Sequence, residues 1–462
     1  MKTVLVIDDD APFRKQAYRW LLGAGWRALE APDGEKGLAM ALRHQPEVIV
    51  CDLRVPRYNG FQVCRMIRAQ RNEIRQPLIL VTSGSDYDSD RQNALESGAD
   101  ACLVKPIVKA ELLKMLEAPS VYQSASSPRK PSQNGQFSSP ISPDLPPMIR
   151  FWGVRGSIPT PGPSTVQFGG NTSCVEVRAD GEIIVLDAGS GIRGLGLSLA
   201  KEFTDHPIRT TVLISHTHWD HIQGFPFFVP AYNPENKLRI IGYEGSRKGL
   251  VSSLSTQMES PYFPVSMRQM PSNIDVTEMK ELEFSVGRVK VQAAFVNHPG
   301  VTVGYRLFTS SGSIVYIPDH EPFQRLRCHI SGQTGINPVE MLKYASDQDQ
   351  RIIEFISDAD VLIIDAQYDD AEYQSHAGWG HGCVDDVVAL ALSARVKQLF
   401  LFHHDPDHDD AQILRMEAWA RQLVEFAHEN LAVNAACEGV KFVLKSAPVE
   451  TDSRSLVATT GL

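Results

Sequence analysis

The sequence lacks the features of a secreted, membrane-spanning or nucleic-acid-coating protein. Its 462 residues contain no apolar stretch of the roughly 18 residues that a membrane span needs. The opening segment MKTVLVIDDD turns acidic after a run of four apolar residues, which is unlike a signal peptide. The seven cysteines form no CxxC pair, and the formal net charge is −10 rather than basic. We therefore expect a cytoplasmic protein with reduced thiols, and with neither DNA nor a membrane as its partner.

What remains is an ordinary globular composition, with 43% hydrophobic and 22% charged residues, interrupted by one unusual segment. Fifteen of the thirty residues at 118–147 are Ser or Pro. Such a segment buries too little apolar surface to offset the entropy lost on ordering. We interpret it as a flexible linker between a first domain at 1–117 and a second at 148–462. The alternative is a loop packed onto one of the domains.

The first domain alternates short apolar runs with stretches of helical periodicity. The runs TVLVID, EVIVCDL, PLILVTS and ACLVKP end at polar residues, and residues 13–23 and 35–43 show helical spacing. This alternation predicts a doubly wound parallel sheet of the α/β class, with its ligand chemistry at the carboxyl ends of the strands. The polar side chains that follow the strands are those of Asp8, Asp9, Asp52, Thr82 and Lys105.

Three carboxylates that converge at one edge of a sheet repel each other, and a hard cation such as Mg²⁺ relieves that repulsion. A lysine beside them can pair with a phosphoryl group. In this pattern residues 1–117 resemble a response regulator receiver domain, which has a (βα)5 fold. The resemblance rests on DD at 8–9, DLRVPRYNG at 52–60, Thr82 and KP at 105–106.

The receiver resemblance implies that Asp52 accepts a phosphoryl group from a histidine kinase or another phosphodonor. Thr82 and Lys105 would sense that group. The carboxylates that would hold Mg²⁺ are those of Asp8, Asp9 and Asp52. The sequence departs from the family three residues before the lysine, where Cys102 stands in place of the usual aromatic switch residue. We therefore expect phosphorylation without the usual aromatic rotamer switch.

The second domain contains the cluster HTHWDH at 216–221, directly after the apolar run TTVLIS. His216 and His218 stand two positions apart, so in an extended segment their side chains lie on the same side. Asp220 and His221 fall in the following turn and can face a second metal ion. Imidazole and carboxylate together suit Zn²⁺, Mn²⁺ or Fe. The alternative is an exposed histidine-rich loop that binds no metal.

HxHxDH is the main signature of the metallo-β-lactamase fold, and residues 148 to about 445 resemble that family. The further motifs follow in order as IIVLDAGSG, FVNHPG, SIVYIPDHEP and LFLFHHDPDH. The resemblance implies an αββα sandwich with two divalent transition metal ions, Zn, Mn or Fe. The ligands implied for one ion are His216, His218 and His298. The ligands implied for the other are Asp220, His221 and His403. Asp319 would bridge the two ions, and Asp187 would orient the ligands from behind.

The segment at 365–406 places His381 before a helix and a strand that leads to His403. This arrangement resembles the phosphodiesterase branch of the fold, which includes ribonuclease Z and the cyclic-phosphate phosphodiesterases. The resemblance implies that His381 approaches the scissile phosphate, where it stabilises charge or protonates the leaving oxygen. The alternative is a structural histidine at a helix cap.

In ribonuclease Z, the arm that grips transfer RNA is inserted between the positions that correspond to His298 and Asp319. Here these two residues are only 21 positions apart, so by this resemblance the chain has no room for such an arm. We therefore expect a small phosphodiester substrate, such as a cyclic nucleotide, with Asp220 and His381 as catalytic residues. The whole chain would be a response regulator with enzymatic output, controlled through Asp52 and compatible with a homo-oligomer. The alternatives are a metal-loaded sensor or scaffold and a thioester or ester hydrolase.

Overall fold

The structure is a computed structural model. It describes residues 2–70, 75–84, 88–116, 141–204, 206–243, 249–259, 262–325 and 338–444. Of the predicted linker at 118–147, residues 118–140 lie outside the described part of the chain. Among the described helices, none has both the length and the apolar character that a membrane crossing requires.

The N-terminal unit (residues 2–116) is a parallel sheet of five strands in the order β2-β1-β3-β4-β5. Its strands are β1 (Thr3–Ile7), β2 (Arg27–Ala31), β3 (Val48–Asp52), β4 (Leu78–Ser83) and β5 (Ala101–Val104). Its helices are α1 (Ala11–Gly23), α2 (Gly34–His44), α3 (Gly60–Ala69), α4 (Asp88–Glu96) and α5 (Lys109–Leu116). Val4 and Val6 pack with α1 and α5, whereas Leu5 and Ile7 pack with α2 and α3 on the other face. The predicted doubly wound fold is confirmed.

The C-terminal unit (residues 141–444) contains two seven-stranded sheets, ordered β11-β10-β9-β8-β7-β6-β19 and β12-β13-β14-β15-β16-β17-β18. The strands of the first sheet are β6 (Met148–Gly153), β7 (Cys174–Ala179), β8 (Glu182–Leu186), β9 (Arg209–Ile214), β10 (Lys237–Gly242), β11 (Asn273–Glu278) and β19 (Lys441–Val443). The strands of the second sheet are β12 (Glu283–Val286), β13 (Val289–Phe295), β14 (Val303–Thr309), β15 (Gly312–Ile317), β16 (Val361–Asp365), β17 (Gln398–Phe402) and β18 (Ala432–Ala435).

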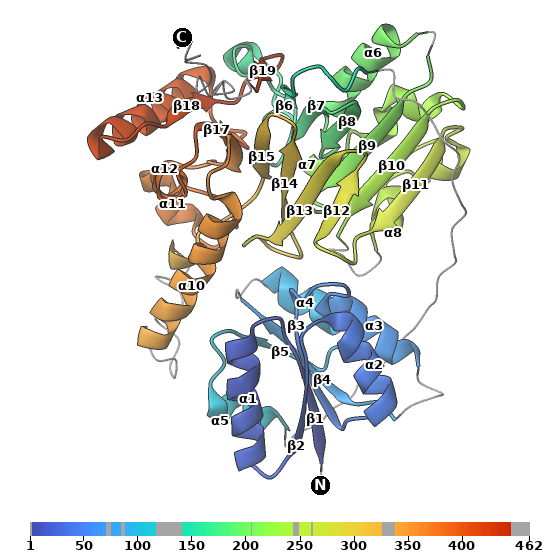
Figure 1. Cartoon of the computed structure of the whole chain (residues 1–462), viewed down its shortest axis with the longest axis vertical. Helices are drawn as coiled ribbons and strands as arrows, with labels where there is room; N and C mark the ends of the chain where they lie inside the picture. Colours follow the sequence, from blue (N-terminus) through green and yellow to red (C-terminus); the bar gives the residue numbers. More distant parts are fainter. Residues whose placement is uncertain are drawn as a thin grey trace, which may run out of the picture.

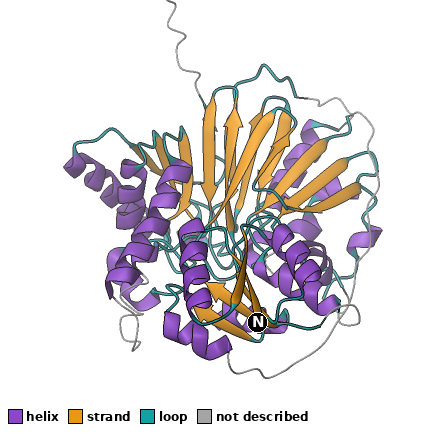
Figure 2. Cartoon of the chain, turned by 60° about the horizontal axis from the view of Figure 1, so that its bottom comes forward, coloured by secondary structure: helices purple, strands orange, loops and turns teal. Residues whose placement is uncertain are grey.

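The helices of the C-terminal unit lie outside these sheets (Figures 1 and 2). They are α6 (Ile192–Glu202), α7 (Trp219–Ile222), α8 (Leu250–Thr256), α10 (Pro338–Ile356), α11 (Asp370–His376), α12 (Val384–Ser393) and α13 (Asp410–Ala427). Short 3-10 turns are η1 (Pro163–Thr165), η2 (Phe225–Phe227), η3 (Val229–Tyr232) and η4 (Met267–Gln269).

The two sheets of the C-terminal unit share one apolar core. Phe151 of β6 and Phe400 of β17 lie with their ring centroids 5.0 Å apart, so side chains of both sheets meet between them. On the outside, α6 packs on the first sheet through Leu195 and Leu199. The helices α10, α12 and α13 pack on the second sheet. The predicted αββα sandwich is therefore confirmed.

The strands deliver polar residues to one edge of the sandwich. Asp187 follows β8 directly, and His403 follows β17 directly. His216 and Asp319 come two residues after β9 and β15. Because β8 runs parallel to β9, and β15 parallel to β16 and β17, their carboxyl ends lie together. Asp187 and His403 have positive φ angles of 61° and 59°. This conformation costs on the order of 1–3 kcal/mol, and such strain gathers at functional sites.

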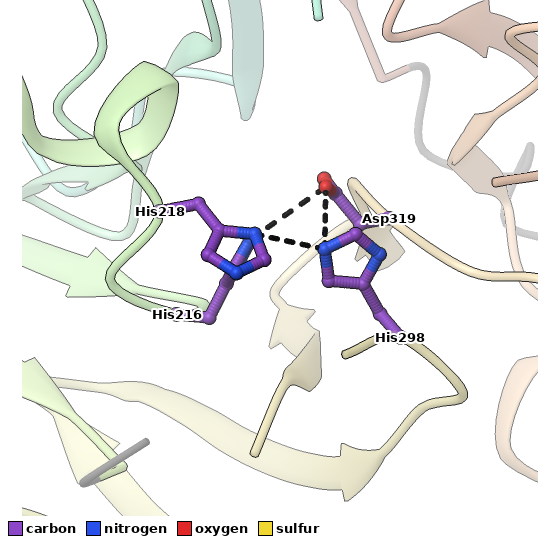
Figure 3. Close-up of side chains that lie close together, drawn as sticks. All are labelled: His216, His218, His298 and Asp319. Carbon is purple, nitrogen blue, oxygen red and sulfur yellow. Dashed lines mark hydrogen bonds and ion pairs between the residues drawn. The ribbon is translucent and has the colours of Figure 1, made fainter. Parts of the chain in front are cut away.

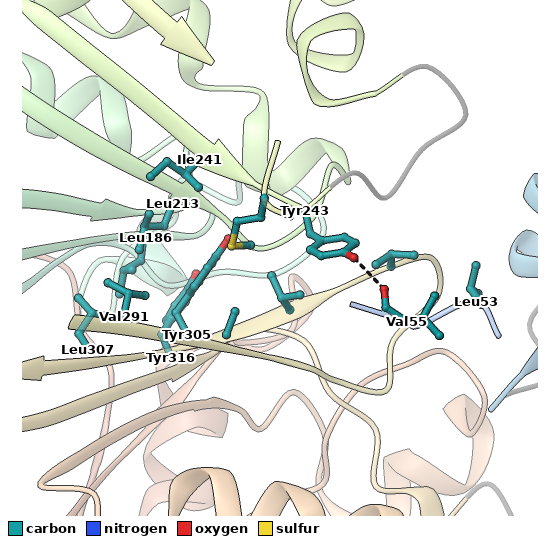
Figure 4. Packing of buried hydrophobic residues seen from close by; sticks show 14 of the residues in the cluster. Leu53, Val55, Leu186, Leu213, Ile241, Tyr243, Val291, Tyr305, Leu307 and Tyr316 are labelled. Carbon is teal, nitrogen blue, oxygen red and sulfur yellow. Dashed lines mark hydrogen bonds between the residues drawn. The ribbon is translucent and has the colours of Figure 1, made fainter. Parts of the chain in front are cut away.

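The carboxyl edge of the N-terminal sheet packs against the C-terminal unit (Figure 1). The hydroxyl of Tyr243, which follows β10, donates a hydrogen bond of 2.8 Å to the backbone oxygen of Val55 (Figure 4). Leu53 and Val55 belong to the same buried cluster as Tyr243 and Tyr305. The apolar core of the sandwich thus continues into the contact between the two units.

Candidate metal centre and phosphorylation site

The HTHWDH segment turns sharply after β9, and this turn presents its side chains in two directions. His218 is extended, with φ −64° and ψ 153°, and it precedes the one-turn helix α7. His216 is buried and His218 is exposed, so one faces the core and the other the opening of the site. Asp220 and His221 are both buried within α7. The segment therefore provides two pairs of side chains: His216 and His218 before α7, and Asp220 and His221 within it.

The first group of potential ligand atoms comes from His216, His218, His298 and Asp319, all within 4.8 Å of one another (Figure 3). Nε2 of His298 lies 2.9 Å from Nδ1 of His218. Oδ2 of Asp319 lies 3.4 Å from Nε2 of His298 and 3.6 Å from Nε2 of His216. These four residues come from three separate loops and surround one point.

The second group comes from Asp220, His221 and His403, again within 4.8 Å. Oδ2 of Asp220 lies 3.1 Å from Nε2 of His403. Oδ1 of Asp319 lies 3.1 Å from Nε2 of His221 and 3.4 Å from Nε2 of His403. The two oxygens of Asp319 therefore face different groups, as a carboxylate that bridges two metal ions would. All seven residues assigned from the sequence as ligands meet here.

The chemistry of these groups fits bound metal ions. Nε2 of His216, Nε2 of His221 and Oδ1 of Asp319 are buried without a hydrogen-bond partner in the described residues. The lack of a hydrogen bond at such buried atoms is costly, and coordination to a cation removes that cost. Burial lowers the pKa values of His216 and His298 well below the usual range, which keeps their imidazoles neutral. Neutral imidazole is the form that binds a metal.

A further layer of hydrogen bonds holds the rings in place. Asp187 contacts Nδ1 of His221 at 2.8 Å and accepts hydrogen bonds from the backbone N–H of Ser215 (2.7 Å) and the Tyr316 hydroxyl (2.8 Å). Nδ1 of His298 lies 2.8 Å from the backbone oxygen of Gly380. Such contacts fix the ring orientation and the tautomer. Asp187 thus lies where the sequence predicts an orienting residue.

His381 lies beside both groups. Its ring centroid is 5.0 Å from that of His298 and 4.9 Å from that of His403. Nδ1 of His381 pairs with Oδ2 of Asp365 at 2.9 Å. Burial acts to lower the pKa of His381, but the carboxylate of Asp365, together with those of Asp319 and Asp220, raises the pKa to about 9. The contact with Asp365 therefore favours the protonated form of His381, beside the two donor groups.

Sequence reasoning assigned no role to Asp365 or to Gln367. Gln367 lies with Oε1 3.0 Å from Nδ1 of His403. A signal for Asp365 existed, because it ends the buried strand β16 just as other site residues follow β8 and β15. Gln367 gave no comparable signal, since an amide two residues beyond a strand is common in loops.

The N-terminal unit holds the second cluster. Ligand oxygens of Asp8, Asp9 and Asp52 lie within 4.8 Å of one another. Nζ of Lys105 lies 2.7 Å from Oδ2 of Asp8 and 2.9 Å from Oδ1 of Asp52. The Thr82 hydroxyl donates a hydrogen bond of 3.1 Å to Oδ1 of Asp52. The structure therefore brings together all five residues that the sequence singled out.

Electrostatics in this cluster favour a cation. Burial raises the pKa of Asp8 to about 7, and the neighbouring Asp52 acts in the same direction while Lys105 opposes it. Burial also raises the pKa of Asp9. Three crowded carboxylates with a single lysine are an all-oxygen donor set with excess negative charge. That set fits Mg²⁺, which supplies the missing positive charge.

Comparison with known proteins divides the chain into the same two parts. Residues 4–117 match the family described as response regulator receiver domain, and residues 183–335 match the beta-lactamase superfamily domain. "Probable transcriptional regulator ycf27" of Porphyridium aerugineum is 38% identical over 109 residues, 24% of this chain and 44% of that protein. "Response regulator MprA" of Mycobacterium leprae is 36% identical over 115 residues, 25% of this chain and 49% of that protein. The chain thus spans about half the length of the curated relatives it matches.

Three solved structures are similar to the C-terminal unit. The metallo-beta-lactamase fold protein YhfI from Bacillus subtilis is 16% identical and covers 64% of this chain and 99% of its own, with a TM-score of 0.44. The short form of human tRNase Z is 18% identical, covers 64% and 99%, and has a TM-score of 0.42. A diphosphatase from the PhnP family is 16% identical, covers 65% and 98%, and has a TM-score of 0.43.

Proposed function

We propose that this chain, in which a response regulator receiver domain precedes a beta-lactamase superfamily domain, is a phosphorylation-controlled metallohydrolase that cleaves a small phosphodiester. We take the receiver to be residues 1–117, the linker 118–147 and the hydrolase 148–462, although Ile141 at the end of that linker already packs in the buried core of the C-terminal unit. The observation that carries the proposal is the pair of donor groups that share Asp319, with His381, which pairs with Asp365, beside both. A phosphodiester carries negative charge and needs both cationic stabilisation and a proton for the leaving oxygen.

The seven donors would hold two divalent ions of the Zn, Mn or Fe kind. His216, His218 and His298 would hold one ion. Asp220, His221 and His403 would hold the other. Asp319 would reach both with its two oxygens. When bound, such ions lower the pKa of water and neutralise charge on phosphoryl oxygens.

The chain's own residues would then order and complete the hydrolysis. The backbone N–H of Ser157 donates a hydrogen bond of 2.8 Å to Oδ2 of Asp220, which fixes the carboxylate beside the attacking water. The water oxygen forms a bond to phosphorus, and the water proton leaves to solvent by way of Asp220. The bond from phosphorus to the leaving oxygen breaks, and that oxygen takes the proton from His381. Asp365 holds the imidazole in the orientation that this transfer needs.

The shape of the site favours a small substrate. The residues between His298 and Asp319 form the short hairpin β14–β15, which lies within the second sheet. No segment extends from this interval to grip a folded RNA. Beside the centre, Trp219 is 73% exposed and Trp379 is 61% exposed. Exposed indole rings next to metal-binding residues can stack on a nucleobase, which supports a cyclic nucleotide or a similar phosphodiester as substrate.

Control by phosphorylation has a physical route through the contact between the units. A carboxylate oxygen of Asp52 would bond to phosphorus while the phosphorus–nitrogen bond of a phosphohistidine donor breaks and the nitrogen keeps the electron pair. The carboxylate of Asp90 on α4 accepts hydrogen bonds from the Ser83 hydroxyl (3.2 Å) and from the backbone N–H of Gly300 (2.6 Å). Gly300 is two residues from the proposed ligand His298. A shift of β4 or α4 on phosphorylation would therefore move Gly300 and, through it, the loop that carries His298.

The test is the initial rate on bis(p-nitrophenyl) phosphate with Mn²⁺ or Zn²⁺. We expect a measurable rate for the wild type and a loss of at least about 10³-fold for Asp220→Ala, because the variant lacks a metal donor and the carboxylate that orients water. Asp275→Ala, which removes an exposed carboxylate from the outer strand β11, is the matched control and should keep the wild-type rate. Cyclic mononucleotides and dinucleotides would follow as substrates.

Two outcomes contradict the proposal and point to the alternatives. A wild type that is inactive on phosphodiesters with either metal but cleaves thioesters would make the chain a thioester hydrolase. A wild type that retains two metal ions per chain and cleaves neither class would make it a metal-loaded sensor or scaffold.

A further inference from the structure

A cavity of about 200 Å³ lies between the carboxylate cluster of the N-terminal unit and the C-terminal unit. Asp9, Asp52 and Lys105 line one wall. The opposite wall includes Tyr344 and Arg351 of α10. A cavity that holds a single water molecule needs a volume of only about 10–15 Å³. The space above Asp52 therefore has room for a phosphoryl group and a cation, and part of its lining belongs to a different domain.

Three polar residues of α10 face this cavity. Tyr344, Gln348 and Arg351 follow one another at intervals of four and three residues, which places them on one face of the helix. A Cβ atom built on Gly84 would lie 2.7 Å from the Tyr344 hydroxyl oxygen. The hydroxyl thus lies directly against the loop that follows Thr82. A side chain at position 84 would force the Tyr344 hydroxyl to shift away from this loop.

Arg351 brings a positive charge to the rim of the carboxylate cluster. Its Nη2 lies 3.7 Å from Oδ2 of Asp10, and its side chain is 48% exposed. Burial raises the pKa of Tyr344 to about 12, with Lys105 opposing and Asp52 adding to the increase. Tyr344 therefore stays a neutral hydroxyl that can donate a hydrogen bond. One donor and one cation from α10 point into the space above Asp52.

Charge balance explains why these groups matter once Asp52 is phosphorylated. Before phosphorylation, Lys105 and an Mg²⁺ ion held by the three carboxylates would together balance their charge. A phosphoryl group brings a charge of about −2 in place of the carboxylate's single charge. The N-terminal unit supplies Lys105 next to Asp8 and Asp52, and its Arg54 also lines the cavity. The extra negative charge attracts a further cation, and the guanidinium of Arg351 lines the same cavity.

We propose that α10 of the hydrolase completes the phosphoryl-binding site of the receiver. Arg351 pairs with the phosphoryl oxygens on Asp52, and the Tyr344 hydroxyl donates a hydrogen bond to them from the opposite wall. Tyr344 then supplies, from another domain, the aromatic side chain that Cys102 does not provide within the receiver. The inference rests on Asp52 as the phosphoacceptor but not on the hydrolytic activity.

A composite site of this kind also reaches the metal centre by a second path. Ile352 lines the cavity and packs with Phe355 and Ile356 in the buried cluster that contains Ile317 of β15. Two residues beyond Ile317 stands Asp319. A pull on α10 by the phosphoryl group would therefore act on the strand that carries the proposed bridging carboxylate.

The experiment is the binding of beryllofluoride to the full chain in the presence of Mg²⁺, followed by fluorine NMR or calorimetry. Beryllofluoride imitates the phosphoryl group, because an oxygen of Asp52 takes the fourth position on beryllium in place of a solvent ligand. We expect Arg351→Gln to raise the Kd about 10-fold and Tyr344→Phe to raise it about 3-fold, as for one charged and one neutral hydrogen bond. Lys343→Gln removes a charge from the exposed side of the same helix and should leave the Kd unchanged.

Amide hydrogen exchange gives a second readout. Beryllofluoride should slow exchange across α10 in the wild type and in Lys343→Gln, but much less in Arg351→Gln. Equal affinity for all four proteins would overturn the composite site and leave Asp52 as a self-sufficient phosphoacceptor. No binding to the wild type would overturn both the inference and the proposed control through Asp52. Neither result depends on a hydrolase substrate, so the proposed phosphodiester chemistry is judged separately.

Discussion

The two ion-binding clusters of this chain occupy the same place in different sheets, at the carboxyl ends of parallel strands, yet they are built from different atoms. The cluster around Asp52 offers only carboxylate oxygens, and Lys105 contacts two of its three acids. The centre around Asp319 offers mainly imidazole nitrogens, and some of its buried atoms lack a hydrogen-bond partner within the described residues. The cation of the first cluster is the side chain of Lys105, whereas the positive charge beside the second comes from imidazoles such as that of His381.

This difference teaches how each cluster can be used. A site that is partly neutralised by a lysine can exchange its Mg²⁺ and its phosphoryl group, as a reversible signal requires. A site in which Nε2 of His216 and Nε2 of His221 make no hydrogen bond among the described residues is costly to keep empty, so its ions should stay bound through many turnovers. The exchangeable site around Asp52 and the proposed permanent site around Asp319 are connected through Asp90 and through α10.

The largest expected effect follows from removing the metals and restoring them one kind at a time. After chelation, hydrolysis of bis(p-nitrophenyl) phosphate should fall to background, and Zn²⁺ or Mn²⁺ should restore it while Mg²⁺ should not. Binding of beryllofluoride should instead return with Mg²⁺. Imidazole-rich sites favour transition metals, and carboxylate sites favour Mg²⁺. Full recovery of hydrolysis with Mg²⁺ alone would show that the two sites do not differ in the way their donors indicate.

A smaller effect is expected from Asp365→Asn, which keeps the size of the side chain but removes the charge that pairs with His381. We expect kcat on the phosphodiester to fall about 10²-fold, the lower range for loss of a general acid. The metal content, measured on the same preparation, should remain at two ions per chain. Asp360→Asn, which removes a partly exposed carboxylate paired with Lys397, is the control. An unchanged kcat for Asp365→Asn would make His381 a structural residue.

The sequence predicts the residues that follow buried strands well, because a run of apolar residues that ends at an acid or a histidine has few structural explanations. Asp187, Asp319 and His403 all carry that signal, and the structure brings them together. Asp365 carries it too, and its partnership with His381 could have been predicted from the end of β16.

The contacts between the two units could not be predicted in this way. Tyr344, Arg351 and Asp90 lie on helices whose periodicity describes only which face is apolar. Their importance depends on how one folded unit packs on the other, and no local pattern encodes that packing. The positive φ angles of Asp187 and His403 also had no signal, since glycine is the residue that usually marks such positions.

The smallest effect tests whether the two clusters communicate through Asp90. In the wild type we expect beryllofluoride to change the phosphodiesterase rate by a factor between about 5 and 150, the usual range of an allosteric coupling. Asp90→Ala removes the acceptor that joins Ser83 to the backbone N–H of Gly300, so the ratio of rates with and without beryllofluoride should fall severalfold. The matched control is Arg57→Gln, which breaks an ion pair with Glu281 between the same two units but at an exposed position.

If both variants keep the wild-type ratio, the signal does not pass through Asp90. A ratio that instead falls in Arg351→Gln would then assign the coupling to α10, and the exchangeable site would act on Asp319 rather than on His298.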